Sequence, residues 1–346
     1  MIPRRAPKGL YTTLIRHKRL MLVIFSILAS ATFLANICIG LTFVSPFQAL
    51  CSVLGDNHCV DESTRFIVVN YRIPVALAAL VSGAALAIGG AAVQAITNNP
   101  LASPYTFGIS SAAAFGAALL YSLNISLIPS MYAATVNAFL FALMACLGVI
   151  SLSRARGLTT VGVILAGICI SFLFQALLAL MEYLAAQDVL QAIVFWMFGS
   201  LYKVTNEKLL IVAINTVGSI LLLLRCSWKL TAMQLGDEGS QALGVNVRRM
   251  RLMVLVVTSL TTAVVVSFFG IIPFVCIAAS HIARLLVGED EKYLLPCSAL
   301  VGASILSVAS VVSKVVQRGA IMPIGIVTSI VGVPVLMHVI LTKRGG

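Results

Sequence analysis

The side chains that could do chemistry are few, and the clearest nucleophile among them is a serine. Ser110 ends the string Gly108-Ile109-Ser110, and His281 stands far along the chain. A serine with a histidine base is the arrangement of a serine hydrolase, here one that would cut peptides within a membrane. Nothing near Ser110 marks an oxyanion hole. The two residues therefore favour helix packing over catalysis, and we expect no catalytic residues.

Carboxylates offer a second kind of chemistry, proton transfer. Glu182, Asp188 and Glu207 stand at the ends of apolar segments and not within them. A proton-coupled transporter needs a carboxylate or histidine relay near the middle of the membrane, so their positions argue against that class. His281 and Arg284 share one helix face. They could line a path, but we expect His281 to pack and Arg284 to reach the inner membrane interface.

Metal and nucleotide sites are not indicated. The eight cysteines are scattered, without a C-x-x-C string or a Cys/His cluster, so we expect neither a metal site nor a cofactor. Cys51 and Cys59 share one short segment and could form a disulfide in an oxidising compartment; the sequence leaves this open. No G-x-x-x-x-G-K-[ST] string is present, so the chain cannot cradle ATP phosphates. Energy for any transport must come from a partner.

The composition places these residues in a polytopic membrane protein. Of 346 residues, 60% are hydrophobic and 10% charged, against roughly a quarter charged in soluble domains. One span needs ~20 apolar residues. We predict an all-α fold with a cytoplasmic segment at 1–19 and a single transmembrane domain at 20–346, containing about ten spans: 20–43, 73–96, 105–122, 128–152, 159–181, 208–225, 252–269, 271–287, 294–313 and 323–341. The first run is too long for a signal peptide, whose apolar core has ~7–15 residues.

The charge distribution predicts how the spans are oriented. With the N-terminus inside and ten spans, 17 of the 23 basic residues fall in inner segments. The net charge of +12 is therefore a topology signal that puts both termini in the cytoplasm, and we expect no nucleic-acid partner. The outer segments hold the other 6: Arg65, Arg72, Lys203, Lys208, Lys314 and Arg318.

One polar segment, 235–251, separates two strongly apolar blocks at the inner face. Its sequence, L-G-D-E-G-S-Q-A-L-G-V-N-V-R-R-M-R, predicts a short helix capped by Asp237 and ended by a left-handed Gly244. Asn246 is a second helix start, and the arginines at 248, 249 and 251 are expected to anchor the next span at the inner membrane surface. A helix held at that face could receive force from a soluble partner.

Three other segments indicate how the helices are arranged. Small residues fill 82–92, which allows close helix contact in lipid. The string T-N-N-P-L-A-S-P at 97–104 stops one helix and restarts another in an inner loop. The apolar piece 195–201 is too short to span, so we predict an interfacial or re-entrant helix with Trp196 near the head groups.

These segments together resemble the FecCD family, the permease subunits of binding-protein-dependent ABC importers for iron–siderophores, haem and vitamin B12. The resemblance runs from about 72 to 341. Its order and spacing make it specific. The strings that carry it are R-I-P (72–74), S-G-A-A-L-A-I-G-G-A-A-V-Q (82–94), N-P-L-A-S-P-Y-T-F-G-I-S (99–110), L-A-G (165–167), W-M-F-G-S-L (196–201), the polar segment from 235, H-I-A-R-L-L-V-G (281–288) and P-I-G-I-V-T-S-I-V-G-V-P (323–334).

The resemblance implies a type II ABC importer permease. Such a chain pairs with a second permease subunit, the same or different, sits on two ABC ATPase subunits and receives cargo from a periplasmic or lipid-anchored binding protein. Residues 235–247 match the cytoplasmic coupling helices, where Gly236, Asp237, Glu238, Leu243 and Gly244 carry over. The implied binding-protein docking residues are Arg72 and Lys314, and the implied cytoplasmic gate residues are Thr159 and Thr160.

The sequence departs from the family pattern at five positions. Ser280 stands where the family usually has Pro, Cys276 where it has Gly, and Ser310 where it has Asp. Lys314 replaces an Arg, and Val75 stands where a second Arg follows the R-x-P string. Fewer charged residues are therefore present at the docking positions than is usual in the family. This fits a chain that works beside a different permease subunit. The sequence leaves homodimer and heterodimer both open.

These inferences predict a permease of the bacterial inner membrane that moves a ferric siderophore by alternating access. Haem and cobalamin remain alternative cargoes, because the binding protein largely chooses the cargo. The runner-up class is a proton-coupled secondary transporter.

Overall fold

The computed structural model describes residues 8–40, 42–55, 59–126, 128, 132–155, 157–316 and 320–342, and it is helical, without a strand in these ranges. Fifteen α-helices lie in them: α1 (Lys8–Cys38), α2 (Pro46–Leu54), α3 (Glu62–Ile67), α4 (Ile73–Thr97), α5 (Ile109–Leu123), α6 (Ala133–Ala155), α7 (Thr160–Leu184), α8 (Gln187–Met197), α9 (Asn206–Arg225), α10 (Ser227–Met233), α11 (Gly236–Ala242), α12 (Val247–Phe269), α13 (Val275–Val287), α14 (Glu291–Val315) and α15 (Ile324–Thr342). Short π- and 3₁₀-turns are η1 (Val68–Arg72), η2 (Pro104–Phe107) and η3 (Leu201–Lys203).

The predicted spans correspond to helices of two lengths. Within the described residues, seven helices are long and apolar enough to cross a membrane, and three shorter apolar helices lie at Ile109–Leu123, Val275–Val287 and Ile324–Pro334. That all ten of these helices cross the membrane stays a prediction. The first helix starts at Lys8, inside the segment expected to precede it. Residues 1–7 and 343–346 lie outside the described part, and with them four of the basic residues used to predict inner termini, Arg4, Arg5, Lys343 and Arg344.

The predicted eighth span, 271–287, is wrong in its first residues. The chain between α12 and α13 is not helical, and Gly270 and Phe274 both have positive φ, of 76° and 67°. A left-handed residue breaks the helical path, so α13 is left with 13 residues, about 20 Å at 1.5 Å per residue. This short helix packs inside the bundle against α4 and α14.

Helix α4 is the centre of the bundle. Its contacts reach α14, α12, α13 and α9, and most of its side chains are buried. Close approach explains the small side chains. A Cβ built on Gly83 would lie 2.3 Å from the Gly302 carbonyl oxygen of α14, and one on Gly90 would lie 2.5 Å from the Cys276 oxygen of α13. The close helix contacts predicted for 82–92 are therefore confirmed.

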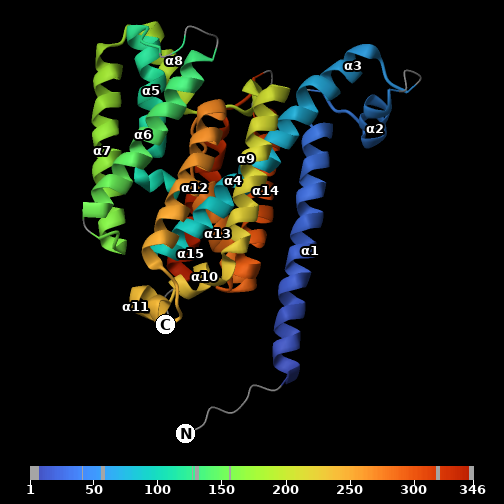
Figure 1. Cartoon of the computed structure of the whole chain (residues 1–346). Coiled ribbons are helices and arrows are strands. Elements are labelled where there is room, and N and C mark those ends of the chain that lie inside the picture. Colours follow the sequence, from blue (N-terminus) through green and yellow to red (C-terminus); the bar gives the residue numbers. More distant parts are fainter. Residues whose placement is uncertain are drawn as a thin grey trace.

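The bundle has two distinct ends (Figure 1). Helices α3 and α8 lie at one end, and the short helices α10 and α11 lie at the other, where α1 also starts. We call these the α8 end and the α11 end. Helix α1 runs along one side of the bundle and contacts α14.

The short helix predicted at 195–201 is present but differs in place and surroundings. Helix α8 covers Gln187–Met197, and the chain then turns through Gly199, whose φ is +70°. Trp196 is 5% exposed, so it is packed in the core and does not face the head groups. Cys51 is buried in α2 and Cys59 is half-buried, and a disulfide between them stays a prediction.

The contact between α4 and α14 yields a paired test. In Gly302→Ala the new Cβ would lie 2.4 Å from both the Ala87 Cβ and the Gly83 oxygen. We expect the thermal unfolding midpoint of the detergent-solubilised chain to fall, with a loss of about 1–3 kcal/mol from overpacking. Gly218→Ala on α9 is the control, since nothing lies within 4 Å of its Cβ position. There, relief of glycine flexibility should add up to ~1 kcal/mol. Equal midpoints for the two variants would contradict the close contact.

Candidate functional site

Two short helices form the surface at the α11 end. Helix α10 follows α9 after one residue, and α11 begins at Gly236, whose φ is +83°. Three large apolar side chains here are exposed: Trp228 by 61%, Leu235 by 65% and Leu243 by 49%. They line a recess of about 360 Å³ with Asp290 of the α13–α14 loop. A projecting apolar surface of this kind suits contact with another protein.

The capping predictions for 235–251 hold at two positions and fail at one. Gly244 has φ +79°, as a left-handed helix end requires, and the Asn246 side chain accepts a bond from Arg249 N at the start of α12. Asp237 does not cap α11, whose N-cap is Leu235 without a side-chain bond. The Asp237 carboxylate is used elsewhere.

That carboxylate binds Arg251, which is 1% exposed and lies within the protein. Arg251 Nη2 lies 2.6 Å from Asp237 Oδ1 and Nη1 lies 3.1 Å from Oδ2, a two-point ion pair. Arg251 was expected to anchor α12 at the membrane surface, and this is wrong. The same face of α12 carries the buried Val247, Val254 and Leu255, so helix periodicity turns Arg251 inward.

Arg251 also binds three other parts of the chain. Its Nε donates to Ile96 O, near the end of α4, at 3.2 Å, and its Nη1 donates to Leu158 O at 2.6 Å. Its Nη2 donates to Thr160 Oγ1 at 2.7 Å, in the first turn of α7. One buried guanidinium therefore joins α11, α4, α7 and α12.

The predicted gate residues lie at this junction. Thr159 is the N-cap of α7, and its hydroxyl accepts from Gly162 N at 3.1 Å. Thr160 accepts from Arg251, as described above. Leu158, just before them, holds a left-handed φ of 56° that residues other than glycine rarely adopt. The structure thus brings the predicted gate and coupling residues together through an arginine assigned to neither group.

Further bonds attach α10 and α11 to the bundle. Ser240 Oγ of α11 donates to the Ala232 carbonyl of α10 at 2.9 Å. Asn98, in the predicted loop 97–104, donates to Met233 O at 3.1 Å. Gln234 donates to the Glu291 carboxylate of α14 at 2.7 Å. The two short helices are thus fixed to the ends of α4 and α14 and do not hang free.

The docking residues predicted at the opposite end are buried. Arg72 is 8% exposed and Lys314 is 4% exposed. Arg72 donates to the carbonyls of Ile37, Cys38 and Thr42 at 2.9, 3.0 and 2.6 Å. Lys314 donates to the Asn36 carbonyl at 2.6 Å. These are carbonyls at and just after the C-terminal end of α1, which lack partners within the helix. Both cations therefore hold the end of α1, and neither projects from the surface.

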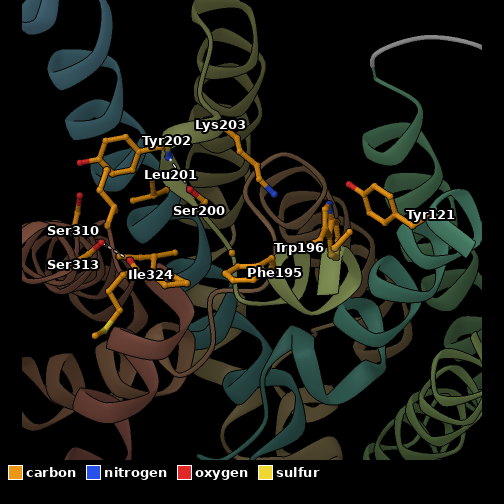
Figure 2. A pocket seen from close by; sticks show the side chains of 15 residues that line it. Tyr121, Phe195, Trp196, Ser200, Leu201, Tyr202, Lys203, Ser310, Ser313 and Ile324 are labelled. Carbon is orange, nitrogen blue, oxygen red and sulfur yellow. Dashed lines mark hydrogen bonds between the residues drawn. The ribbon is translucent and has the colours of Figure 1, made fainter. Parts of the chain in front are cut away.

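The α8 end also contains a recess of about 280 Å³. Figure 2 shows Lys203 of η3, Trp196 of α8 and Tyr121 of α5 converging on it. Burial raises the pKa of Tyr202 to about 12, and burial, then the neighbouring Lys208, lowers the pKa of Lys203. The recess offers aromatic faces, hydroxyls and one amine.

Backbone bonds join the ends of α8, α12 and α15 beneath this recess. Ser200 N donates to Phe269 O of α12 at 2.7 Å, and Gly325 N of α15 donates to Phe198 O at 2.9 Å. A Cβ on Gly325 would lie 2.6 Å from Phe198 O. We call this contact between the ends of α8, α12 and α15 the backbone junction.

Comparison with known proteins places this arrangement in a family. The model of the FecCD transport family matches residues 26–342. The chain belongs to the FecCD family. It is 33% identical to the hemin transport system permease protein HmuU of Yersinia pestis, over 83% of this chain and 87% of the relative. It is 32% identical to the Fe(3+)-citrate import system permease protein YfmE of Bacillus subtilis, over 93% and 94%.

A solved structure shows the same fold. It is described as an inward-facing conformation of a putative metal-chelate type ABC transporter, and it matches with a TM-score of 0.80 at 29% identity. The match covers 94% of this chain and 99% of that one. This FecCD chain is therefore an all-helical, multi-pass ABC transporter permease.

The departures of this FecCD chain from the family pattern have local structural partners. Ser280 Oγ bonds to the Cys276 carbonyl at 2.7 Å, within α13. Ser310 Oγ donates to Asn36 Oδ1 at 3.2 Å, beside Lys314. Val75 is buried. Each residue serves packing within the FecCD chain, and none restores charge at the α8 end.

The remaining predicted polar pair is also placed. His281 is buried, and Arg284 Nη2 donates to Gln94 Oε1 of α4 at 3.2 Å. Arg284 Nη1 lies 3.6 Å from the exposed Glu289 carboxylate near the α11 end. Ser110 stands on α5, whereas His281 stands on α13.

The Arg72 contacts predict a loss of stability. Arg72→Met removes the donors to Ile37, Cys38 and Thr42. Cys38 O keeps its bond from Val44 N and Thr42 is exposed, so the main cost is the loss of a donor to the buried Ile37 carbonyl, about 1–3 kcal/mol. We expect a lower thermal midpoint and faster hydrogen exchange at the end of α1. The control is Arg225→Met, which replaces an exposed arginine at the end of α9. Unchanged exchange at residues 36–42 in Arg72→Met would show that this contact is unimportant.

Proposed function

We propose that this chain is the membrane permease of a binding-protein-dependent ABC importer that moves a ferric siderophore into the cytoplasm by alternating access. The observation that carries the proposal is the α11 end, where an exposed apolar surface is bonded directly to the ends of the long helices. A partner ATPase that moves this surface would move the bundle. The family and the metal-chelate type structural relative support the same reading.

The proposed contact with the ATPase lies on α11 and the turn after it. Glu238, Leu243 and Gly244 are exposed, so they are available to a partner. Gly236 permits the turn between the two short helices. Asp237 serves the contact from within, because it is held by Arg251. In this proposal the α11 end is cytoplasmic, two ATPase copies bind to a permease pair, and the long helices cross the bacterial inner membrane.

Docking of the binding protein is proposed at the α8 end. Because Arg72 and Lys314 are buried, we assign them an indirect role, in which they hold the end of α1 that supports the outer loops. A second permease subunit, identical or different, would complete the path. The recess at the α8 end has only about 280 Å³, whereas ligand sites usually have ~300–1,000 Å³. Helix α7 exposes large apolar side chains, including Phe172 and Leu173, that a second subunit could cover.

The cargo assignment rests on the relatives and on the recess. Both named relatives carry iron chelates in their descriptions, hemin and Fe(3+)-citrate. The Lys203 amine suits an anionic chelate. Haem and cobalamin are the alternatives to a ferric siderophore. Uptake of the three cargoes by proteoliposomes containing the permease, its ATPase and its binding protein would separate them.

The same proteoliposomes test the transport class. We expect uptake of a ferric siderophore to require ATP on the side of the membrane where the ATPase is bound. Uptake should persist without a proton gradient. Uptake driven by a proton gradient alone would overturn the ABC assignment in favour of a secondary transporter.

Gly244→Arg tests the proposed ATPase contact. Nothing lies within 4 Å of the Gly244 Cβ position, so we expect the variant to insert and assemble. The protruding side chain should interfere with the ATPase surface, so uptake per ATP hydrolysed should fall at least tenfold. Gly244→Ala is the matched control, since it bears the same strain at φ +79° without the bulk. Normal uptake by Gly244→Arg would remove the coupling role.

A further inference from the structure

Arg251 occupies a position that no surface role explains. It is 1% exposed, so it cannot touch a partner protein. Its bonds nevertheless connect the proposed ATPase contact, through Asp237, with the first turn of α7, through Thr160. The bond to Ile96 O adds a third attachment, on the central helix α4.

We propose that Arg251 is the positioning residue that transmits movement of α11 to the start of α7, and so to the gate. This inference rests on the proposed function. The inference adds a residue to the proposed transport mechanism, because neither the coupling surface nor the gate threonines include Arg251.

The ion pair makes α11 and α12 move together. A guanidinium held in the interior is strongly disfavoured once its carboxylate is removed. If a partner displaces α11, separating Asp237 from Arg251 would leave the guanidinium buried and unpaired, at a high cost in free energy. The lower-cost movement carries Arg251 along, because both Nη atoms are bonded to the same carboxylate.

The same Nη atoms then act on α7. Nη1 holds the Leu158 carbonyl at 2.6 Å, and Leu158 has a left-handed φ of 56°. Such a conformation persists only where its surroundings enforce it. A shift of Arg251 releases or tightens this turn and with it the first residues of α7. Nη2 donates to Thr160, the first residue of α7. A shift of Arg251 therefore displaces the helix itself as well as the turn before it.

Lysine cannot replace this geometry. Arginine presents a planar fork of five donors, whereas the lysine ammonium is a single point with three. The bonds of Arg251 use all three guanidinium nitrogens: Nε donates to Ile96 O, Nη1 to Leu158 O and Nη2 to Thr160 Oγ1. Both Nη atoms also bind the Asp237 carboxylate. Arg251→Lys should keep the attraction to Asp237 but lose the connection to α7.

The test uses the permease assembled with its ATPase in proteoliposomes. A cysteine at Val161, which is 66% exposed in the first turn of α7, reports movement there by its rate of maleimide labelling. The exposed Cys169 is changed to Ser, and labelling of the same chain without Val161→Cys gives the background. Labelling is compared without nucleotide and after trapping with ATP and vanadate.

We expect the nucleotide-dependent change in labelling rate to fall at least fivefold in Arg251→Gln and in Arg251→Lys, while the ATPase subunit still copurifies and hydrolyses ATP. Uptake per ATP should fall in parallel. Arg249→Gln is the control, because Arg249 is exposed two residues earlier on the same helix. It should behave as the unaltered chain.

A second variant covers the case in which Arg251→Gln does not fold. Asp237→Asn keeps the shape of the side chain and the Arg251 bonds to α4 and α7, but removes the ion pair, and it should reduce the labelling change in the same way. Asp237→Glu, which keeps the charge, should restore at least half of it. An unaltered labelling change in Arg251→Gln or Asp237→Asn would overturn the inference alone. If the unaltered complex shows neither ATP-driven uptake nor a labelling change, the proposed function fails and the inference fails with it.

Discussion

The structure depends on how closely other helices approach the backbone of α4. At Gly83 and Gly90 a side chain would collide with the carbonyl oxygens of Gly302 and Cys276. In lipid, where apolar burial gives helices little reason to associate, close van der Waals contact of this kind supplies much of the attraction. It also fixes α4 relative to α13 and α14. The centre of the bundle is therefore its most closely packed part.

At both ends of the bundle, buried cationic side chains donate hydrogen bonds to carbonyls at helix ends. Helix ends leave carbonyls without partners, and a buried end must find donors. Arg72 and Lys314 supply them for α1, and Arg251 supplies one for α4 at Ile96. The three cations differ in what else they bind. Arg72 and Lys314 bind residues of one local segment, whereas Arg251 also binds a carboxylate from a surface helix. The first arrangement holds an end in place, and the second connects two elements.

Sequence reasoning was most successful where a residue type has few possible conformations. Gly244 and Asn246 were placed correctly because a left-handed turn and an N-cap each favour a short list of residues. The burial of Arg251 was not predicted, because composition rules assign long cations to surfaces. The docking role of Arg72 and Lys314 was carried over from the family resemblance and stays a prediction, although both side chains are buried. A signal for Arg251 was present, since Val247, Val254 and Leu255 put it on the buried face of α12. The break before α13 has a signal in Gly270 and Pro273, which both interrupt helices. The left-handed φ of Phe274 has none, because bulky residues rarely adopt positive φ.

The backbone junction beneath the recess at the α8 end has a consequence for how such permeases diverge. Its bonds run from Ser200 N to Phe269 O and from Gly325 N to Phe198 O, so main-chain atoms hold the helix ends together. The side chains above it, among them Tyr121 and Lys203, are free of that task. Substitution at these positions alters charge and shape at the mouth while the frame is retained. Relatives of this chain can thus differ in the chemistry of this recess by a handful of codon changes, without rebuilding the scaffold.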